Sequence, residues 1–492
     1  MVRNISKQLI SLTKEAFFDY VLPAIKDKYS ASLDKFFVNI TSSVAYGVAD
    51  KHSDIDVFIL FREHKDYLKF HEKFDKIIKA IKFPEKFEGM CDKGMRFEFE
   101  SLKKSDVLDF YRTQSYETWM NQTEWLLCWL VNSVTIYDPK DYITSFKKKI
   151  KFFDGDVLKS KVNMSFILLL KYQKILSKID PLNEHYLADF YFFKVAKQLM
   201  NLAYWSAKKY TPHTKWQYFM LQFIGSYGPA LYYDLDLILA TDNPNRLKII
   251  GKWTAQFGRY WFNHKILDKE IYNFYINEYK FNTENSSNKN IILFKNYGEV
   301  IKNKGNIFSS LNSLGKFSNF FLNEETNIVY LGKYDYDAIM RIQDKYVGLD
   351  TGKISSKIQT KRINYLHFII WRKIRVINGA LKRNNRFNQA WYANQAVEHI
   401  IEMSFRLKKQ KLPLEFIQLS SLKSSGYFPQ IYPLLIKSFK LDTPNKIEIL
   451  WKCFFILQKY IKKNKILSQF QIGNPLEIQF DIEYWKYENL RL

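Results

Sequence analysis

Two aspartates separated by one residue stand at the head of an apolar strand, directly after a turn of small residues; residues 40–60 read ITSSVAYGVADKHSDIDVFIL. Side chains alternate between faces along a strand, so Asp54 and Asp56 share one face while Ile55 and Val57 turn to the core. Two carboxylates this close repel each other unless a cation lies between them, and Mg²⁺ prefers such hard oxygen ligands. The pattern predicts a divalent-metal site at the edge of a sheet, although a bare Asp-x-Asp also suits a solvated strand end.

The turn before this strand offers groups that bind phosphate. The Ser43 hydroxyl and the backbone N–H groups near Gly47 could hold the terminal phosphates of a nucleotide against the metal. The arrangement resembles the polymerase-beta-like nucleotidyltransferase superfamily, whose signature is Gly-Ser, a short helical turn with another Gly, and then Asp-x-Asp. Ser42 stands where that family usually has its first glycine, so a catalytically degenerate copy is an alternative. The predicted nucleotide-binding residues are Ser42, Ser43, Gly47, Ser53, Lys171 and Lys215.

A second acidic strand is predicted at residues 95–100, which read MRFEFE. Alternation places Phe97 and Phe99 in the core and Glu98 and Glu100 on the opposite face. The resemblance implies a third carboxylate here, which either ligates the metal or accepts the proton of the attacking hydroxyl. Glu98 is favoured and Glu100 is the alternative, because strand register cannot be derived from sequence. A half-exposed edge strand with ordinary charged positions is the other interpretation.

The resemblance also implies a reaction. Asp54, Asp56 and Glu98 are the predicted ligands of two Mg²⁺ ions, with Glu100 as a further candidate catalytic residue and an NTP as co-substrate. The metals stabilise the attacking and leaving oxygens while an acceptor hydroxyl attacks the α-phosphorus and pyrophosphate leaves. The expected activity is transfer of an NMP, most simply AMP, to a hydroxyl.

The predicted fold class is α+β, with an N-terminal mixed sheet and helices followed by one or two α-helical bundles. A helix is predicted at residues 65–81, between the two acidic strands, from its stripe of apolar residues at helical spacing. A chain of 492 residues fits two or three domains. The predicted divisions are a catalytic domain at 1–155, a helical bundle at 156–280, an irregular connecting segment at 281–336 and a second, basic helical domain at 337–492.

Long amphipathic helices are predicted at 157–178 and 189–209, with another starting near Lys215. This segment resembles the helical half of antibiotic nucleotidyltransferases of the kanamycin and lincosamide type. In several relatives that half supplies a lysine to the triphosphate, which makes Lys171 and Lys215 candidates by location. The alternative for each is an ordinary surface lysine.

A faint internal repeat runs through the helical part of the chain. The sequence around Phe190 aligns with that around Trp391, and Pro212 aligns at the same offset with Pro413. This predicts that the C-terminal third is a second bundle of the same kind. Chance alignment of two amphipathic helices is the alternative.

The net charge of +25 is unevenly distributed. Acids and bases nearly balance over residues 1–155, so the excess of lysine and arginine lies in the rest of the chain. The segment 353–386 is basic and free of acidic residues, a pattern that suits RNA binding through phosphates. Composition bias explains the same pattern equally well. The acceptor is therefore predicted to be a small molecule or RNA, with a protein hydroxyl or a non-catalytic nucleotide- or RNA-binding role as alternatives.

Other classes of protein fit the sequence poorly. The three cysteines have no metal-type spacing, and no nucleotide-binding loop of the Gly-x-x-x-x-Gly-Lys-Ser/Thr or Gly-x-Gly-x-x-Gly kind is present. No segment approaches about 18 uncharged apolar residues, so neither membrane spanning nor a membrane partner is expected. The chain is expected to be a basic cytoplasmic protein, and its oligomeric state cannot be read from sequence.

Overall fold

The computed structural model of the protein describes residues 2–51, 53–87, 94–101, 124–150, 152–153, 155–212, 214–240, 242–276, 319–321, 329–331, 356–410, 418–467 and 473. The chain forms two compact units. Unit 1 comprises Met1–Val157 and Tyr204–Met220, and unit 2 comprises Leu158–Ala203 and Leu221–Leu492. The predicted connecting segment 281–336 lies almost entirely outside the described residues, so the predicted division at 280 and 336 stays a prediction.

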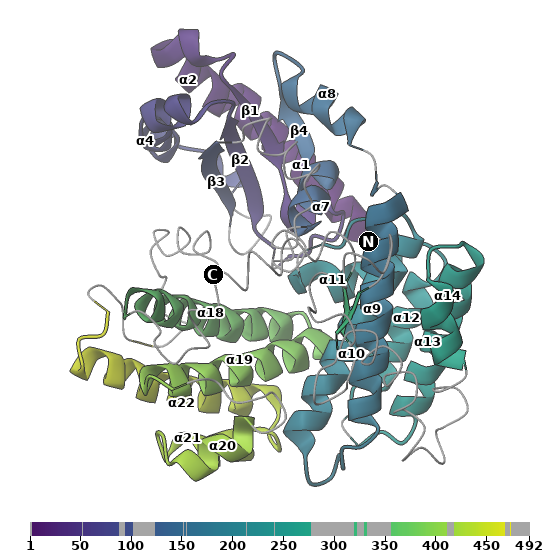
Figure 1. Ribbon diagram of the computed structural model, residues 1–492. Helices are drawn as coiled ribbons and strands as arrows, with labels where there is room; N and C mark the ends of the chain where they lie inside the picture. Colours follow the sequence, from purple (N-terminus) through teal and green to yellow (C-terminus); the bar gives the residue numbers. More distant parts are fainter. Residues whose placement is uncertain are drawn as a thin grey trace, which may run out of the picture. The chain divides into compact units, whose positions relative to one another are not determined.

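Unit 1 is built on a four-stranded mixed sheet of order β3-β2-β1-β4 (Figure 1). Strand β2 lies antiparallel to β1 and parallel to β3, and β4 lies antiparallel to β1 on its other side. The strands are β1 (Phe36–Ile40), β2 (Ile55–Phe61), β3 (Met95–Ser101) and β4 (Val134–Tyr137). The mixed sheet and the strand at 95–100 confirm the predicted fold class.

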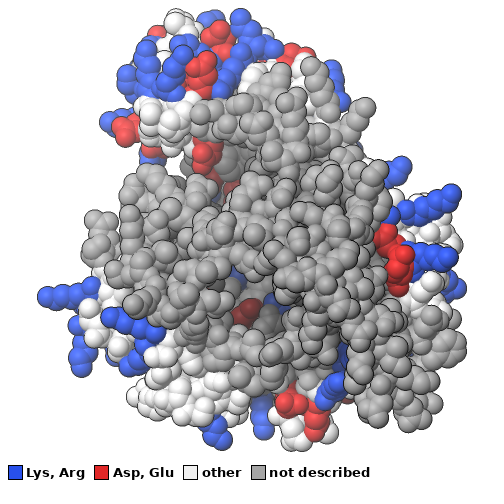
Figure 2. Space-filling model, in the orientation of Figure 1, with Lys and Arg blue, Asp and Glu red and all other residues white. Residues whose placement is uncertain are grey.

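Helices cover both faces of this sheet. The helical elements described in unit 1 are α1 (Val2–Ala16), η1 (Phe17–Val21), α2 (Leu22–Tyr29), η2 (Ser30–Ser32), α3 (Ser42–Ala45), α4 (His64–Ala80), η3 (Glu85–Phe87), α7 (Glu124–Asn132), α8 (Tyr142–Lys149) and α11 (Thr214–Met220). Helix α4 confirms the helix predicted at 65–81. Figure 2 shows basic and acidic side chains interleaved over the end of the unit that carries α2 and α4, as the balanced charge of residues 1–155 leads one to expect.

The sheet has a large core on one face and a smaller one on the other. The large core combines Val57, Ile59 and Phe97 with apolar side chains of α1, α2 and α4. On the opposite face, Leu60 packs with Leu130 of α7 and with side chains of α8. Because β2 alternates strictly, the face covered by α7 and α8 is also the face of Asp54 and Asp56.

Unit 2 is almost entirely helical in its described part. Its elements are α9 (Gly155–Leu176), α10 (His185–Ser206), η4 (Leu221–Phe223), α12 (Gly228–Leu237), α13 (Arg246–Asn263), α14 (Lys269–Phe274), α18 (Ser356–Lys382), α19 (Arg386–Leu407), α20 (Gln418–Ser425), α21 (Ile431–Ser438) and α22 (Thr443–Lys463), with a small hairpin of β5 (Asn319–Phe321) and β6 (Val329–Leu331); the ends of α9 and α10 belong to unit 1. These helices agree with those predicted from residue 157 onward. Across the described residues, no helix is both long and apolar enough to cross a bilayer.

The helix order repeats, as the internal sequence repeat predicts. Helices α9 to α13 recur as α18 to α22, and both α10 and α19 contain 22 residues. The chain leaves these two helices in the same way, through Lys208 at a φ of 53° and Lys409 at a φ of 57°. The two equivalent helices also pack on each other, since the Phe193 ring lies 5.4 Å from that of Phe387. The described helices of the C-terminal third therefore follow the same order as α9 to α13.

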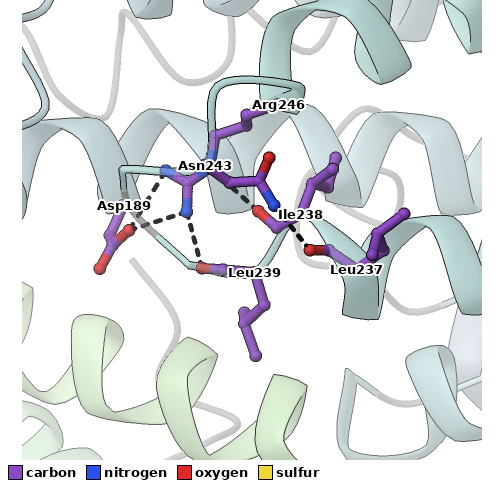
Figure 3. Close-up of polar contacts among 6 residues, drawn as sticks. All are labelled: Asp189, Leu237, Ile238, Leu239, Asn243 and Arg246. Carbon is purple, nitrogen blue, oxygen red and sulfur yellow. Dashed lines mark hydrogen bonds and ion pairs between the residues drawn. The ribbon is translucent and has the colours of Figure 1, made fainter.

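A buried arginine stabilises the end of α12 in unit 2 (Figure 3). The Arg246 side chain donates to the carbonyls of Ile238 (3.0 Å) and Leu239 (2.7 Å), and it forms an ion pair with Asp189 at 3.2 Å. Asn243 donates to the Leu237 carbonyl at 2.9 Å. These donors satisfy carbonyls that a helix end leaves without intrahelical partners. Arg246 is only 4% exposed, so these partners replace the water that would otherwise solvate its positive charge.

We expect Arg246→Met to destabilise unit 2 by about 3 kcal/mol, because it keeps the volume but leaves the Asp189 carboxylate and the two carbonyls without their donor. The control is Lys252→Met, on the same helix as Arg246, which removes an exposed ion pair with Asp234 of α12 and should cost less than about 1 kcal/mol. Urea unfolding midpoints would measure both. Equal effects of the two substitutions would contradict the role given to Arg246.

Candidate active site

The turn between β1 and β2 is tied to the start of β2. The Thr41 amide donates to the Asp56 carbonyl at 3.0 Å, and the Val48 amide donates to the Ser43 carbonyl at 2.9 Å. Between these bonds the chain makes one helical turn, α3, and leaves it through Gly47 at a φ of 73°. Glycine takes up this left-handed conformation without steric cost. The turn thus holds a fixed position beside the two aspartates.

Ser42 also adopts a left-handed conformation, with a φ of 56°. A non-glycine residue pays roughly 1–2 kcal/mol for it, which gives a physical reason for the glycine usual at this position in the family. The Ser42 hydroxyl lies close enough to the Asp56 carboxylate to lower its pKa. The serine therefore adds a contact to the acidic site that glycine could not supply.

The two other serines of the predicted site have different surroundings. Ser43 is fully buried, and its hydroxyl has no hydrogen-bond partner among the described residues. A buried hydroxyl in a phosphate-type turn suits a ligand oxygen, because an unsatisfied polar group is otherwise costly. Ser53 donates instead to the Asp50 carboxylate at 3.0 Å and accepts from the Asp50 amide at 3.0 Å. Its hydroxyl closes the loop that leads into β2.

Three carboxylates lie together on the sheet face covered by α7 and α8. Burial raises the pKa of Asp56, and the neighbouring Asp54 raises it further. Burial, followed by the charge of Asp56, raises the pKa of Glu98 to about 7. The strand register pairs Glu98 with Phe58 and places Glu100 beside Leu60, farther from the aspartates, where it is exposed.

Two cations offset this negative charge. Arg96 lies beside Asp56 in the strand register and forms an ion pair with Asp54 at 3.9 Å. Lys215, in the first turn of α11, lies close enough to lower the pKa of Asp56. The structure thus brings Lys215 to the acidic site. The other candidate, Lys171, belongs to unit 2, where its ammonium lies 5.9 Å from the Tyr172 ring.

The donor set fits a hard divalent cation. Carboxylate oxygens are the ligands that Mg²⁺ prefers. Burial and the neighbouring acids raise the pKa values of Asp56 and Glu98, so a nearby cation would stabilise their ionised forms. Within the described part of the chain, however, no three His, Cys, Asp or Glu side chains are already arranged around a common metal position. Substrate phosphates and water would have to complete the coordination, as they usually do for Mg²⁺.

A buried polar cluster lies behind the turn and was not predicted from the sequence. The Tyr46 hydroxyl is hydrogen-bonded to the Cys128 thiol of α7, and burial raises the pKa of that thiol to about 12. The Tyr204 hydroxyl donates to the Gln217 carbonyl of α11 at 2.8 Å. Glu124 at the start of α7 is 7% exposed and belongs to the same region. A lone acid opening the apolar run EWLLCWLV was the one sequence signal that could have pointed to this cluster.

Ser42→Gly and Ser42→Ala separate the backbone strain at Ser42 from the effect of its hydroxyl on Asp56. Both remove the hydroxyl, but only glycine relieves the left-handed conformation, so the glycine variant should be more stable than the alanine variant by about 1 kcal/mol. Urea unfolding of the two variants side by side would measure the difference. An alanine variant at least as stable as the glycine variant would rule out strain at this position.

Glu98→Gln should stabilise the metal-free protein at pH 8 and have little effect near pH 4. Above a pH of about 7, the folded-state pKa of Glu98, the native protein carries a partly buried negative charge that water solvates well in the unfolded chain. The stability that protonated Glu98 gives the native protein is therefore lost as the pH rises through 7. Removing the charge should recover on the order of 2 kcal/mol at pH 8. Thermal unfolding in EDTA at both pH values would test it; a pH-independent difference would contradict the assignment.

Two family models match parts of the chain. Residues 24–114 match a family model described as a nucleotidyltransferase domain, and residues 119–217 match one described as a domain of unknown function (DUF4037). A solved structure, the nucleotidyltransferase-like protein from Exiguobacterium sibiricum 255-15, is 11% identical over 63% of this chain and 99% of that chain, with a TM-score of 0.29. No curated protein matches the chain.

The first match spans the turn, both aspartates and Glu98, which are the residues that the superfamily signature predicts. The second match ends just after Lys215. Closer kinship with the kanamycin type stays a prediction. Residues 24–114, in the N-terminal part of the chain, therefore belong to a nucleotidyltransferase domain of the polymerase-beta-like superfamily.

Proposed function

We propose that the protein transfers an NMP, most simply AMP, from an NTP to the hydroxyl of an acceptor in a Mg²⁺-dependent reaction that releases pyrophosphate. The observation that carries the proposal is the placement of the unpartnered Ser43 hydroxyl in a turn that is bonded to the same strand as Asp56. A phosphate-binding hydroxyl and a set of carboxylates short of positive charge are what an NTP–metal complex requires.

Each residue of the site has a distinct task in this reaction. Ser43 and the backbone near Gly47 bind the β- and γ-phosphates, and Lys215 adds positive charge on the same side. Asp54 and Asp56 hold the divalent cation, with Glu98 as the third carboxylate. Bound Mg²⁺ would supply Lewis acidity toward the phosphate oxygens and the acceptor hydroxyl.

Glu98 is the better of the two candidates for receiving the acceptor proton. Glu98 is half-buried and lies beside Phe58 on the same face of the sheet as Asp56, whereas Glu100 is exposed and farther along the strand. The proton passes to the Glu98 carboxylate as the acceptor oxygen bonds to the α-phosphorus. The bond from that phosphorus to the bridging oxygen breaks, and pyrophosphate carries away the electron pair.

The acceptor is proposed to be a small molecule with a hydroxyl group. The alternative, RNA, rests on the basic segment 353–386, and several of its described cations contact their own bundle. The Lys373 ammonium lies 4.8 Å from the Tyr392 ring, and the Arg375 guanidinium lies 4.9 Å from the Trp371 ring. Lys353 and the side chains of Lys357, Lys361 and Arg362 lie outside the described part of the chain.

Asp56→Asn should abolish transfer without unfolding the protein, because it removes a metal ligand and also relieves the repulsion with Asp54. The measurement is transfer of label from each α-labelled NTP, with Mg²⁺, to metabolite extract, aminoglycosides or total RNA. The matched control is Asp34→Asn, an exposed carboxylate of the same unit, paired with Lys140 at 3.7 Å, which should leave transfer unchanged.

Three outcomes would decide between the candidate functions. Label in the small-molecule fraction only with an intact Asp56 supports the proposal. Salt-sensitive labelling of RNA moves the acceptor to RNA. Nucleotide binding without label in any fraction favours the catalytically degenerate alternative, and full activity of Asp56→Asn would overturn the assignment of the site.

A further inference from the structure

Glu124 is a buried acid that joins two elements on either side of a turn. It opens α7 and is 7% exposed. A single carboxylate oxygen, Oε1, accepts hydrogen bonds from the Trp205 indole Nε1 (2.9 Å) and from the Thr211 amide (2.7 Å). Hydrogen bonds to an ionised acceptor are about twice as strong as neutral ones. A buried carboxylate with two such donors therefore fixes the positions of both donors relative to α7.

The two donors flank the turn that leads into α11. Trp205 lies in the last turn of α10, and Thr211 lies three residues before α11 begins. Between them the chain reverses through Lys208, at a φ of 53°. Glu124 thus holds the start and the end of this turn together and sets where α11 begins.

Helix α11 carries Lys215 to the acidic site. Lys215 follows Thr211 by four residues, its ammonium lies 4.8 Å from the Trp216 ring, and its charge lowers the pKa of Asp56. The bond from Tyr204 to the Gln217 carbonyl, at 2.8 Å, adds a second attachment of the same helix. A small shift of the α11 start would move Lys215 relative to Asp56.

We propose that Glu124 is a positioning residue for nucleotidyl transfer, which fixes the start of α11 so that Lys215 presents its charge to the NTP phosphates beside Asp56. This inference rests on the proposed function, because it assigns Lys215 to the triphosphate. Glu124 itself does not touch the reacting groups. Its effect is therefore expected on NTP binding, and it should vanish when Lys215 is absent.

The test is a double-mutant cycle on the full chain with Glu124→Ala, Lys215→Ala and the double variant. Each single substitution should raise the KM and the Kd for NTP about tenfold, and the double variant should be no weaker than Lys215→Ala, because coupled residues act through one interaction. Glu124→Gln is the matched control. Its Oε1 can accept both hydrogen bonds, so its KM and Kd should stay within about twofold of the unsubstituted protein.

A purely structural role of Glu124 predicts a different pattern. Glu124→Ala would then lower stability and kcat equally in the presence and absence of Lys215, and additive effects of this kind would overturn the proposal. If Glu124→Ala does not fold, Trp205→Phe removes the indole N–H donor while an aromatic ring remains at this position. The same cycle with Lys215→Ala then applies. Loss of coupling in that cycle would also overturn it.

Equilibrium binding of a non-hydrolysable NTP separates this inference from the proposed function. A protein that binds NTP but transfers no label contradicts the proposed function, and the Kd cycle still decides whether Glu124 acts through Lys215. A protein that transfers label with Kd values insensitive to both Glu124→Ala and Lys215→Ala overturns the positioning role alone. No NTP binding by the unsubstituted protein would overturn both.

Discussion

The electrostatic repulsion among three carboxylates is the constraint around which unit 1 is organised. Asp54, Asp56 and Glu98 share one face of the sheet, and burial together with their mutual charge raises the pKa values of Asp56 and Glu98. The protein offsets this cost only partly, with the nearby charges of Arg96 and Lys215. Clustered carboxylates without a bound cation destabilise the folded protein, and a bound divalent cation removes that cost. The repulsion that lowers the stability of the metal-free protein therefore favours binding of a divalent cation.

The surroundings of these acids hold them in place at some cost in strain. Ser42 keeps a left-handed backbone, and its hydroxyl lowers the pKa of Asp56, so a conformational cost accompanies a favourable effect on the site. Such strain is commonly stored where function needs it. Behind the turn, Cys128 of α7 interacts with Tyr46 of the β1–β2 turn, and Glu124 of α7 bonds to the turn before α11. One short helix therefore links the β1–β2 turn to the helix that carries Lys215.

Unit 2 shows how a repeated helix order can diverge in its buried polar contacts. Asp189 of α10 pairs with Arg246 and also acts on the pKa of Lys446, the residue that follows Pro444-Asn445 as Arg246 follows Pro244-Asn245. The equivalent region of α19 places an alanine, Ala390, where α10 has this aspartate. Asp189 thus interacts with one cation from each repeat. Strict symmetry is lost at this position, because the first repeat alone supplies the acid that interacts with both cations.

Local patterns in the sequence determined the elements and their faces. The period-2 alternation of residues 54–60 and 95–100 predicted both acidic strands, and the helical stripe at 65–81 predicted α4, because these periods reflect backbone geometry. Only the tertiary structure decided which glutamate lies nearest the aspartates, since the β2–β3 register comes from packing. It also decided that Lys215, and not Lys171, lies in the same unit as Asp56. Glu124 shows the limit most clearly: its partners, Trp205 and Thr211, are more than 80 positions away, and no local pattern records a contact that only chain folding creates.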